Sequence, residues 1–254
     1  MWTPFKAKAT KAYWWKEVPN FGDALAPLLL EHFADVKVEW GTISHSQIAS
    51  VGSILEHIPP LWDGLIVGSG RIMENSRLHI QQMRSGITAK ILSLRGPLTA
   101  RGISGSYALG DPGILADELV GIQDKKWDLG IIPHFSDKTL EQKFRTLVPV
   151  KHSIKVIHPS DDPLNVLRDI GSCHRIVTSS LHGMIVADAF GIPRRVEYSP
   201  TLSKDGGDFK FRDYSASIHT TFETGKMMEP VRVRVEDVKF SVYDVYRSIK
   251  GELK

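Results

Sequence analysis

The chain has 254 residues, of which 42% are hydrophobic and 24% charged, and its formal net charge at pH 7 is +3. This composition is typical of a globular protein with one large domain or two of moderate size, and it excludes a disordered chain. A single cysteine, Cys173, excludes an intrachain disulfide framework and a cysteine-rich zinc site. The small positive charge suits an anionic small ligand or a membrane surface. It is smaller than the positive charge typical of proteins that bind nucleic acids.

The N-terminal segment is basic and aromatic. Its first stretch, MWTPFKAKATKAYWWK, contains no acid, has no apolar core of a signal peptide, and includes Trp2, Phe5, Lys6, Lys8, Lys11, Tyr13, Trp14, Trp15 and Lys16. We expect a cytoplasmic protein, because no apolar run is long enough to span a membrane. A segment of this kind can also lie on anionic headgroups, so peripheral contact with the inner face of the plasma membrane is a second expectation. We favour the simpler interpretation, in which a basic terminus leads into a first strand at 13–18.

Short apolar runs ending in Gly, Ser or Asp alternate with helical patterns along the chain. In the first half, we expect strands at 12–18, 36–40, 65–70, 91–96 and 107–113, and helices at 24–33, 97–102 and 114–119. After a polar stretch at 120–128, we expect strands at 129–137, 154–162, 174–180 and 194–198, and helices at 163–171, 181–190 and 235–253. The alternation predicts an α/β fold with parallel sheets, in two Rossmann-like domains, 1–120 and 121–254, that face a cleft. The last helix is amphipathic and belongs to the second domain.

Three strands of the second half end in a histidine, at His134, His158 and His182. If the strands are parallel, these histidines share the edge of the sheet where ligands bind in open α/β sheets. A three-histidine zinc site is one interpretation, but the ligands lack a short spacing and no carboxylate or cysteine joins them. We therefore expect no metal and interpret His158, which precedes a proline, as a structural residue.

The segment VTSSLHGMIVADAFGIP, at 177–193, places a histidine in the first turn of an apolar helix. Ser179 or Ser180 is suited to cap that helix, and Gly191 is suited to end it. Unpaired backbone N–H groups and the helix dipole favour an anion there, and His182 is placed to move a proton. The alternative is that His182 only packs and Gly183 only allows close helix-to-sheet contact. We favour the functional interpretation, because an early glycine weakens a helix.

A turn with similar features, PNFGDALAP, begins the first predicted helix. It contains Asn20, Gly22 and Asp23. Asp23 has two interpretations. It is suited to cap the helix, and it is equally suited to accept a proton from a sugar hydroxyl through its carboxylate.

Two further strand ends of the first half carry candidate ligand residues. Arg95 follows the apolar strand at 91–94, so we expect its side chain at the rim, where a guanidinium can grip a carboxylate or phosphate. The loop VGSGR at 67–71 brings backbone close to a ligand through Gly68 and Gly70, but Met73 departs from the dinucleotide fingerprint. Cys173 and His174 are adjacent and point to opposite sides, so we discount them as a nucleophile and base.

Taken together, NFGDAL, VGSG, LRGPLTARG, LGDPGILA, IPHFSD, SSLHGMIVADAFGIP and KFRDY appear in an order that resembles the polysaccharide pyruvyl transferase family, in its bacterial exopolysaccharide branch. The likeness runs from Asn20 to about Tyr214. It implies a GT-B-like glycosyltransferase architecture. It also implies that phosphoenolpyruvate, as co-substrate, donates its three-carbon unit to two hydroxyls of a sugar, forming a cyclic ketal and releasing phosphate without a cofactor. The acceptor implied is a lipid-linked oligosaccharide at the inner membrane face.

On this resemblance His182 matches the family's motif histidine and is our hypothesis for the general acid, with Asp23 as base. Residues predicted to bind the donor are Arg95, His134, Ser179, Ser180, Gly183, Arg194 and Lys210. Residues predicted to bind the acceptor are Asn20, Gly22, Gly68, Ser69, Gly70 and Arg71. Ser180 departs from the pattern, because many family members carry an arginine there. Arg194, Arg195, Arg71 or Lys210 would then supply the missing positive charge, although Arg194 and Arg195 also fit the start of a strand.

Three other classes of function fit parts of the sequence. A nucleotide-sugar glycosyltransferase of the same architecture would need an acid for the ribose, and Glu197 is its best candidate. A non-enzymatic sugar- or membrane-binding module would use the Trp- and Lys-rich terminus. A basic nucleic-acid binder ranks last, so we expect no nucleic-acid partner.

Overall fold

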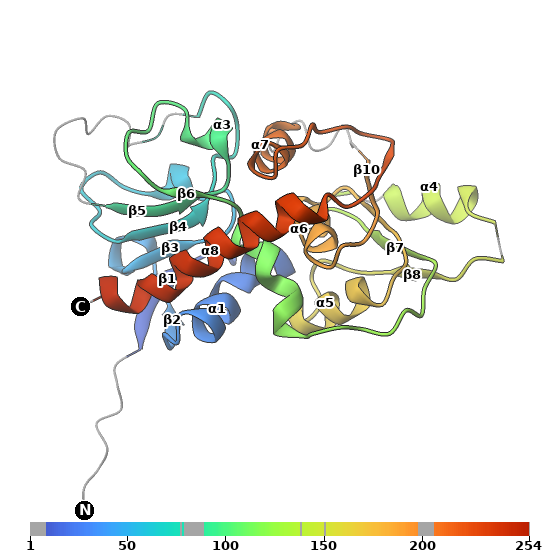
Figure 1. Ribbon diagram of the computed structural model, residues 1–254, viewed down its shortest axis with the longest axis horizontal. Coiled ribbons are helices and arrows are strands. Elements are labelled where there is room, and N and C mark those ends of the chain that lie inside the picture. Colours follow the sequence, from blue (N-terminus) through green and yellow to red (C-terminus); the bar gives the residue numbers. More distant parts are fainter. Residues whose placement is uncertain are drawn as a thin grey trace, which may run out of the picture.

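A computed structural model describes residues 9–76, 78, 89–137, 139–149, 151–197 and 206–253. Within these residues the strands form two sheets, which occupy the two lobes of the molecule (Figure 1). Trp2, Phe5, Lys6 and Lys8, on which the expected membrane contact depends, lie outside the described residues. None of the described helices is both long and apolar enough to cross a membrane.

The first sheet contains six described strands in the order β2-β1-β3-β4-β5-β6, and all its pairings are parallel. Its strands are β1 (Thr10–Tyr13), β2 (Val38–Trp40), β3 (Ile48–Ser50), β4 (Leu65–Ser69), β5 (Lys90–Leu94) and β6 (Ala108–Leu109). Its helical segments are α1 (Phe21–Phe33), η1 (Ile43–His45), η2 (Leu55–His57), α3 (Pro97–Ala100) and η3 (Pro112–Leu119). From β1 the chain passes to β2 at one edge of the sheet and then returns to β3 on the other side of β1. The direction in which strands are added therefore reverses between β1 and β3.

The second sheet repeats this reversal in the described residues 129–228. Its order is β11-β10-β9-β7-β8, parallel except for β10 with β11. Its strands are β7 (Leu129–Ile132), β8 (Ile154–Val156), β9 (Ile176–Thr178), β10 (Arg194–Val196) and β11 (Met227–Met228). Its helices are α4 (Leu140–Leu147), α5 (Pro163–Gly171), α6 (Leu181–Ala189) and α7 (Phe209–Ser217). Here the order reverses between β7 and β9.

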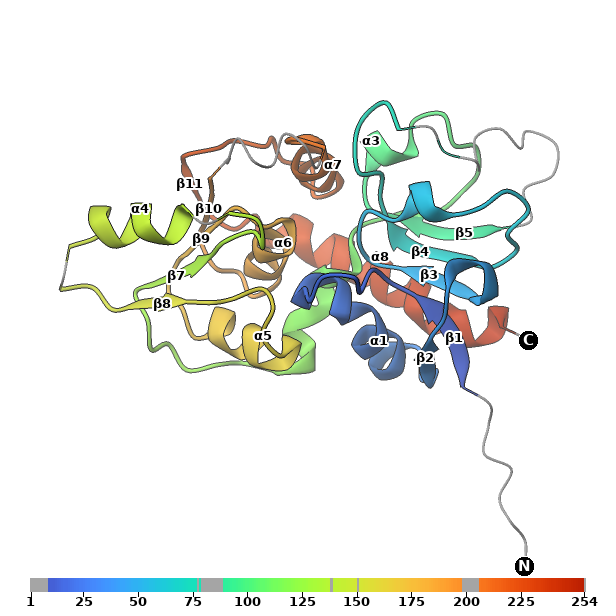
Figure 2. The ribbon, with the colours of Figure 1, turned by 180° about the vertical axis from the view of Figure 1, so that it is seen from behind.

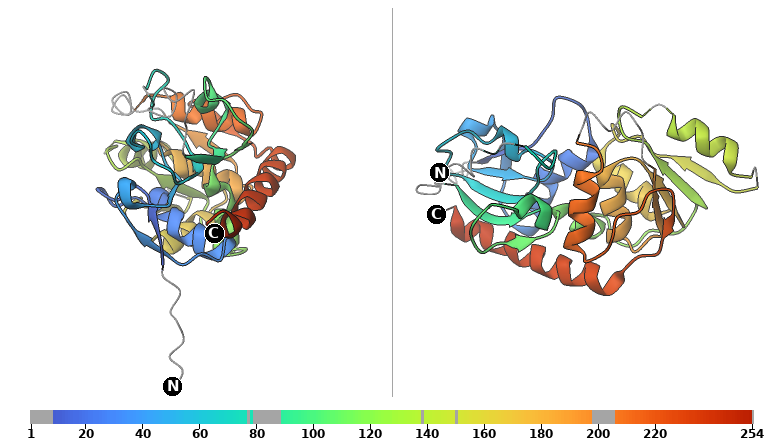
Figure 3. Two further views of the ribbon diagram at one scale, coloured as in Figure 1. Left: turned by 90° about the vertical axis from the view of Figure 1, so that its left-hand side faces the viewer. Right: turned by 90° about the horizontal axis from the view of Figure 1, so that it is seen from above.

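The terminal helix α8 (Arg232–Glu252) runs along both lobes, as the right panel of Figure 3 shows. It contacts α1, β5 and β6 on one side and α6 on the other. The Tyr246 hydroxyl lies 3.1 Å from Ser50 Oγ in the first lobe, and Lys239 donates to Asp117 of η3 and to the Ala189 carbonyl at the end of α6. The largest buried apolar cluster also contains residues of both lobes, such as Leu29 and Ile185. The lobes are therefore held as one packed body.

The predicted α/β class with parallel-dominated sheets is confirmed, while the division into domains at 120 and 121 stays a prediction. The helix predicted at 235–253 is present, but it also packs on the first lobe rather than only on the second. The strand predicted at 13–18 is wrong, because β1 ends at Tyr13 and the following residues leave the sheet. The pattern also missed β3, α4 and α7 (Figure 2).

Candidate functional site

A pocket of about 210 Å³ lies where the carboxyl ends of both sheets meet. Its lining follows β1, β3 and β4 in the first lobe and β7 and β9 in the second, together with α7: Trp15, Val18, Asn20, Asp23, Gly52, Ser53, Ile54, His57, Ile72, His134, Phe135, Ser180, Leu181, His182 and Lys210. The reversal of strand order at β1/β3 and at β7/β9 opens a crevice in each sheet, and ligands of open α/β sheets bind at such points. The two crevices form one pocket here.

Helix α1 begins at this pocket with the NFGD turn. Asn20 is the N-cap, and its side chain accepts a hydrogen bond from the Gly22 backbone N–H at 3.1 Å. Asp23 was open to interpretation as the cap, but it lies in the first turn and lines the pocket instead. Gly22 packs on His182: a Cβ added to Gly22 would lie 2.0 Å from Nδ1 of that ring. Glycine is thus required where the starts of α1 and α6 approach each other.

Asp23 is a buried carboxyl group, 8% exposed. Its Oδ1 lies against the backbone of Gly52, where an added Cβ would be 2.5 Å from it. Burial raises its pKa from 3.8 to about 7, because desolvation disfavours the charged form. Lys210 opposes this rise and the carboxylate of Asp111 adds to it. Asp23 is therefore poised to gain or lose a proton near neutral pH.

His182 occupies the second position of α6, where the sequence predicted it. The Ser180 side chain caps the helix by accepting from the Gly183 N–H at 3.5 Å, and Gly183 packs closely on Thr178 of β9. Burial, together with the positive charges of Arg95 and Lys210, lowers the pKa of His182 from 6.5 to about 3. The ring is therefore neutral at pH 7.

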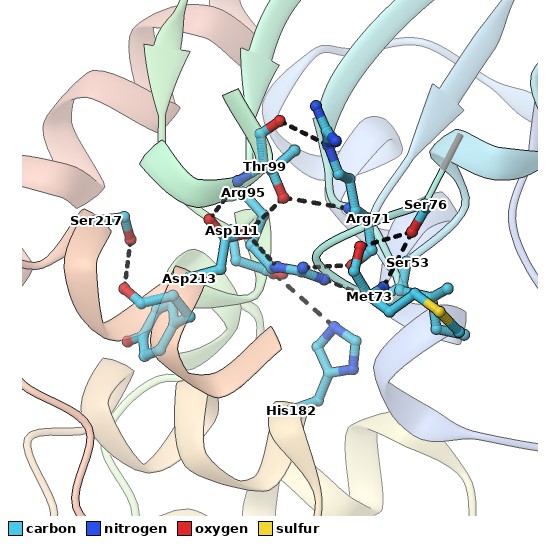
Figure 4. Close-up of polar contacts among 12 residues, drawn as sticks. Ser53, Arg71, Met73, Ser76, Arg95, Thr99, Asp111, His182, Asp213 and Ser217 are labelled. Atoms are coloured by element: carbon cyan, nitrogen blue, oxygen red, sulfur yellow. Dashed lines mark hydrogen bonds and ion pairs between the residues drawn. The ribbon is translucent and has the colours of Figure 1, made fainter. Parts of the chain in front are cut away.

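Asp111 faces the other side of this ring. Its Oδ1 lies 3.9 Å from His182 Nε2, too long for a hydrogen bond, and it accepts from the Gly113 N–H as the N-cap of η3 (Figure 4). His182 Nε2 and Asp111 Oδ2 are buried and have no hydrogen-bond partner in the described residues. Asp111 belongs to the motif LGDPGILA, but its position behind the histidine was not predicted from the sequence.

Arg95 does not reach the rim as we expected; its side chain is fully buried behind the pocket. Its Nε donates to Asp213 Oδ2 at 2.9 Å, its Nη1 to Ser53 Oγ at 2.6 Å, and its Nη2 to the Arg71 carbonyl at 2.6 Å (Figure 4). Asp213 also accepts from the backbone N–H and the hydroxyl of Thr99. The guanidinium of Arg95 is buried because the carboxylate of Asp213, on α7, gives it the partner that a buried charge requires.

Through this network α7, which follows β10 of the second lobe, packs against the first lobe. Asp213 and Lys210 both belong to α7, and α7 contacts α3. A Cβ at Gly96 would lie 2.1 Å from the Asp213 carbonyl oxygen, so the two backbones touch. Lys210, which the sequence predicted as a donor ligand, is 8% exposed and lines the pocket, where its charge acts on Asp23 and His182.

His134 lines the pocket as predicted, whereas Ser179 does not. The hydroxyl of Ser179 accepts from the His134 backbone N–H at 2.9 Å and donates to Asp137 Oδ2 at 2.7 Å. Its position is thus a structural one that fixes the loop after β7. His134 Nδ1 lies 2.7 Å from Ser136 Oγ.

Most of the VGSGR loop lies behind the lining rather than in it. Gly68 has a φ of +71° and packs on Pro112, while Gly70 packs on the guanidinium of Arg95. Arg71 is buried and donates to the carbonyls of Thr99 and Arg101. Ser69 is buried as well, so none of these four residues lines the pocket.

Gly52 and Ser53 line the pocket in place of this loop. They follow β3, a strand that was not predicted from the sequence. β3 has only three residues, IAS, with no β-branched alternation beyond Ile48.

Arg194 and Arg195 begin β10 and make ion pairs away from the pocket lining. Arg194 pairs with Asp188 at 3.1 Å, and Tyr214 donates to the same carboxylate. Arg195 and Lys143 both pair with Glu197, and these charges lower the pKa of its carboxyl group. Neither arginine therefore replaces the cation missing at Ser180, and Lys210 is the remaining predicted candidate that lines the pocket.

The remaining titratable candidates lie apart. His158 is exposed and outside the lining, so of the three histidines predicted at strand ends only His134 and His182 line the pocket. No group of three or more His, Cys, Asp or Glu side chains in the described ranges is placed to hold a metal ion. Burial raises the pKa of the Cys173 thiol to about 12, which opposes a nucleophilic role.

The fold and the pocket define an α/β protein whose two sheets share one pocket at their switch points. The sequence model of the polysaccharide pyruvyl transferase family matches residues 20–196, and the chain belongs to that family. It is 28% identical over 237 residues to the succinoglycan biosynthesis protein ExoV of Rhizobium meliloti, which covers 88% of this chain and 69% of that protein. It is also 29% identical over 211 residues to an uncharacterized protein of Acanthamoeba polyphaga mimivirus, covering 80% and 71%. The expected family is thereby confirmed.

Proposed function

We propose that the protein transfers the pyruvyl group of phosphoenolpyruvate to two hydroxyls of one sugar in exopolysaccharide synthesis. Family membership and the similarity to a succinoglycan biosynthesis protein support a transferase that acts on a polysaccharide. The observation that carries the proposal is the pair Asp23 and His182, whose pKa values are driven apart in one pocket, to about 7 and about 3. Such a pair defines an acid and a base. Two sheets that face a shared pocket also fit the GT-B-like arrangement.

The direction of the two shifts reverses the roles in our sequence hypothesis. A histidine with a pKa of about 3 is neutral and cannot serve as the acid of the free protein at pH 7, whereas Asp23 is about half protonated. We therefore assign Asp23 as general acid and His182 as general base. An anionic donor adds negative charge to the pocket and raises both pKa values, so Asp23 keeps its proton and His182 becomes a stronger acceptor.

The donor would be held on the side of the second lobe. Lys210 supplies a positive charge, and the first backbone N–H groups of α6 have no partner within the helix. Ser53 accepts from Arg95, so the proton of its hydroxyl is directed elsewhere and suits a hydrogen bond to a carboxylate or phosphate oxygen. Arg95 then acts as a positioning residue for Ser53.

The reaction follows from these positions. Asp23 gives its proton to the methylene carbon of phosphoenolpyruvate, and the neighbouring carbon becomes electrophilic. The first sugar hydroxyl adds there while His182 accepts its proton. The second hydroxyl then attacks the same carbon and gives its proton to the Asp23 carboxylate. The C–O bond to phosphate breaks as His182 returns its proton to the leaving phosphate, so the ketal is complete and both side chains regain their starting states. Asp111, close behind the ring, would stabilise the protonated histidine.

Phosphate release and product mass test this function directly. Methyl glycosides of galactose, mannose and glucose are incubated with phosphoenolpyruvate, and the products are analysed by mass spectrometry. We expect acceptor-dependent phosphate release and a pyruvate ketal, lost in Asp23→Asn and His182→Gln. His158→Gln, at an exposed histidine outside the pocket, is the matched control and should keep wild-type activity. Activity retained in Asp23→Asn would contradict the assignment.

The acceptor in the cell is proposed to be a lipid-linked oligosaccharide, presented in the cytoplasm at the inner membrane face. A nucleotide-sugar donor is less well supported, because Glu197, the candidate for its ribose, is paired with Lys143 and Arg195 outside the pocket.

A further inference from the structure

We propose that Trp15, His57 and Tyr13 form the subsite that holds the acceptor sugar ring, with the indole of Trp15 as its stacking platform. The inference rests on the proposed function, since it names where the second substrate binds. None of these residues was predicted as a site residue from the sequence, and Tyr13 and Trp15 precede the stretch that matches the family, residues 20–196.

The three rings form one cluster at the pocket. Trp15 and His57 both line it, with ring centroids 5.4 Å apart and planes inclined by 42°. Tyr13 packs edge-on against His57 at 5.9 Å, and its hydroxyl lies 2.7 Å from His57 Nδ1. This hydrogen bond fixes the imidazole ring and leaves Nε2 as the nitrogen that can bond a ligand.

Their positions follow from the first sheet. Trp15 comes two residues after β1, and His57 ends η2, shortly after β3. The two residues therefore flank the switch point from its two sides and belong to the first lobe, whereas His134, Ser180 and Lys210 belong to segments that follow β7 and β9 or lie on α7. Trp15 is only partly buried, so part of the indole is open to a ligand.

The charges of the two walls differ. Among the described residues that line the first-lobe wall there is no lysine or arginine, and Asp23 carries their only carboxyl group. The cation of the lining is Lys210, on α7. An anionic donor is favoured at Lys210, whereas the wall of Trp15, Val18 and Ile54 suits a neutral ligand with one apolar face. A pyranose has such a face of C–H groups and carries hydroxyls at its edge for His57.

A nucleobase could also stack on an indole. We favour the sugar because a nucleotide brings phosphates, and the described lining residues of the first lobe, where Trp15 lies, include no lysine or arginine to pair with them. Nucleotide binding at Trp15 is therefore an outcome that would overturn the proposal.

Steady-state kinetics and direct binding test the subsite with Trp15→Ala and Trp15→Phe. The probes are the methyl glycosides of galactose, mannose and glucose, with phosphoenolpyruvate present. For the glycoside that the wild type uses best, we expect KM to rise at least tenfold in Trp15→Ala and to return most of the way in Trp15→Phe. The KM for phosphoenolpyruvate and its effect on the melting temperature should stay unchanged. Phe240→Ala, at an aromatic side chain that is 69% exposed on α8, is the control.

Direct binding, followed by saturation-transfer NMR of the same glycosides, keeps the subsite separate from the reaction. Binding that depends on Trp15 without transfer would support the subsite and contradict the proposed function. Transfer with an unchanged glycoside KM in Trp15→Ala would overturn the subsite alone. Failure of the wild type to bind any of the three glycosides would overturn it too, as would a loss of uridine diphosphate binding in Trp15→Ala.

Discussion

Replacing Asp23 by Asn should stabilise the protein at alkaline pH while it abolishes transfer. The pKa of Asp23 is raised from 3.8 to about 7, so folding disfavours the ionised carboxylate. The penalty is absent below pH 3.8, grows as the pH rises, and is complete above pH 7. A pKa rise of this size corresponds to about 4 kcal/mol, because one pH unit is worth about 1.4 kcal/mol.

The assay is thermal or urea unfolding of the wild type and Asp23→Asn at pH 4 and pH 8. We expect nearly equal stability at pH 4 and a variant more stable by up to about 4 kcal/mol at pH 8. In a chain of this size, each kcal/mol shifts the melting temperature by roughly 2–4 °C. Asp63→Asn, at an exposed carboxylate, is the control and should show no such pH-dependent gain. An Asp23→Asn variant that is equally destabilised at both pH values would refute the buried, partly protonated carboxyl group.

Other consequences concern the same site and the network behind it. Lys210→Gln removes a charge that lowers the pKa of Asp23, so the alkaline limb of the pH profile of kcat/KM should move to higher pH while the KM for phosphoenolpyruvate rises; an unmoved limb would separate Lys210 from Asp23. Asp213→Asn leaves the buried guanidinium of Arg95 without its carboxylate, and urea unfolding should show a loss of about 3–5 kcal/mol, against little change in Asp208→Asn, whose half-exposed side chain lies at the start of the same helix. Gly22→Ala would place a Cβ 2.0 Å from His182 Nδ1, so kcat should fall by at least tenfold, and a fully active variant would contradict the close approach of α1 and α6. His182→Gln removes a ring whose pKa is lowered to about 3, so the variant should lose less stability than the wild type as the pH falls from 6.5 towards 3, measured by acid unfolding.

The sequence was sufficient to predict the elements whose signals are local. The cap at Ser180, the early Gly183 and the terminal Gly191 predicted α6 and the position of His182. The alternation of apolar runs and helices predicted two parallel sheets, and the four-residue spacing of Val238, Val242 and Tyr246 predicted α8. These features depend on neighbours within a few residues along the chain.

The parts that the sequence could not predict depend on distant partners. Arg95 was expected at the rim because an arginine after a strand has no local reason to be buried; its reason is Asp213 on α7, far along the chain. Arg194 is held in the same way by Asp188 and Tyr214. The roles that we propose for His182 and Asp23 are the reverse of those expected from the sequence, because the burial that shifts their pKa values arises only when the two lobes meet. The short strand β3 carried too few residues for a pattern, so Gly52, Ser53 and His57 were missed with it.

The central claim, protonation of phosphoenolpyruvate at its methylene carbon followed by ketal formation, is tested most directly by running the transfer in D₂O. The proton that Asp23 delivers comes from solvent, so mass spectrometry of the isolated ketal should find one deuterium in its methyl group and, with Asp23→Asn, no ketal. A product without deuterium in that methyl group, or one that retains phosphate, would contradict this account.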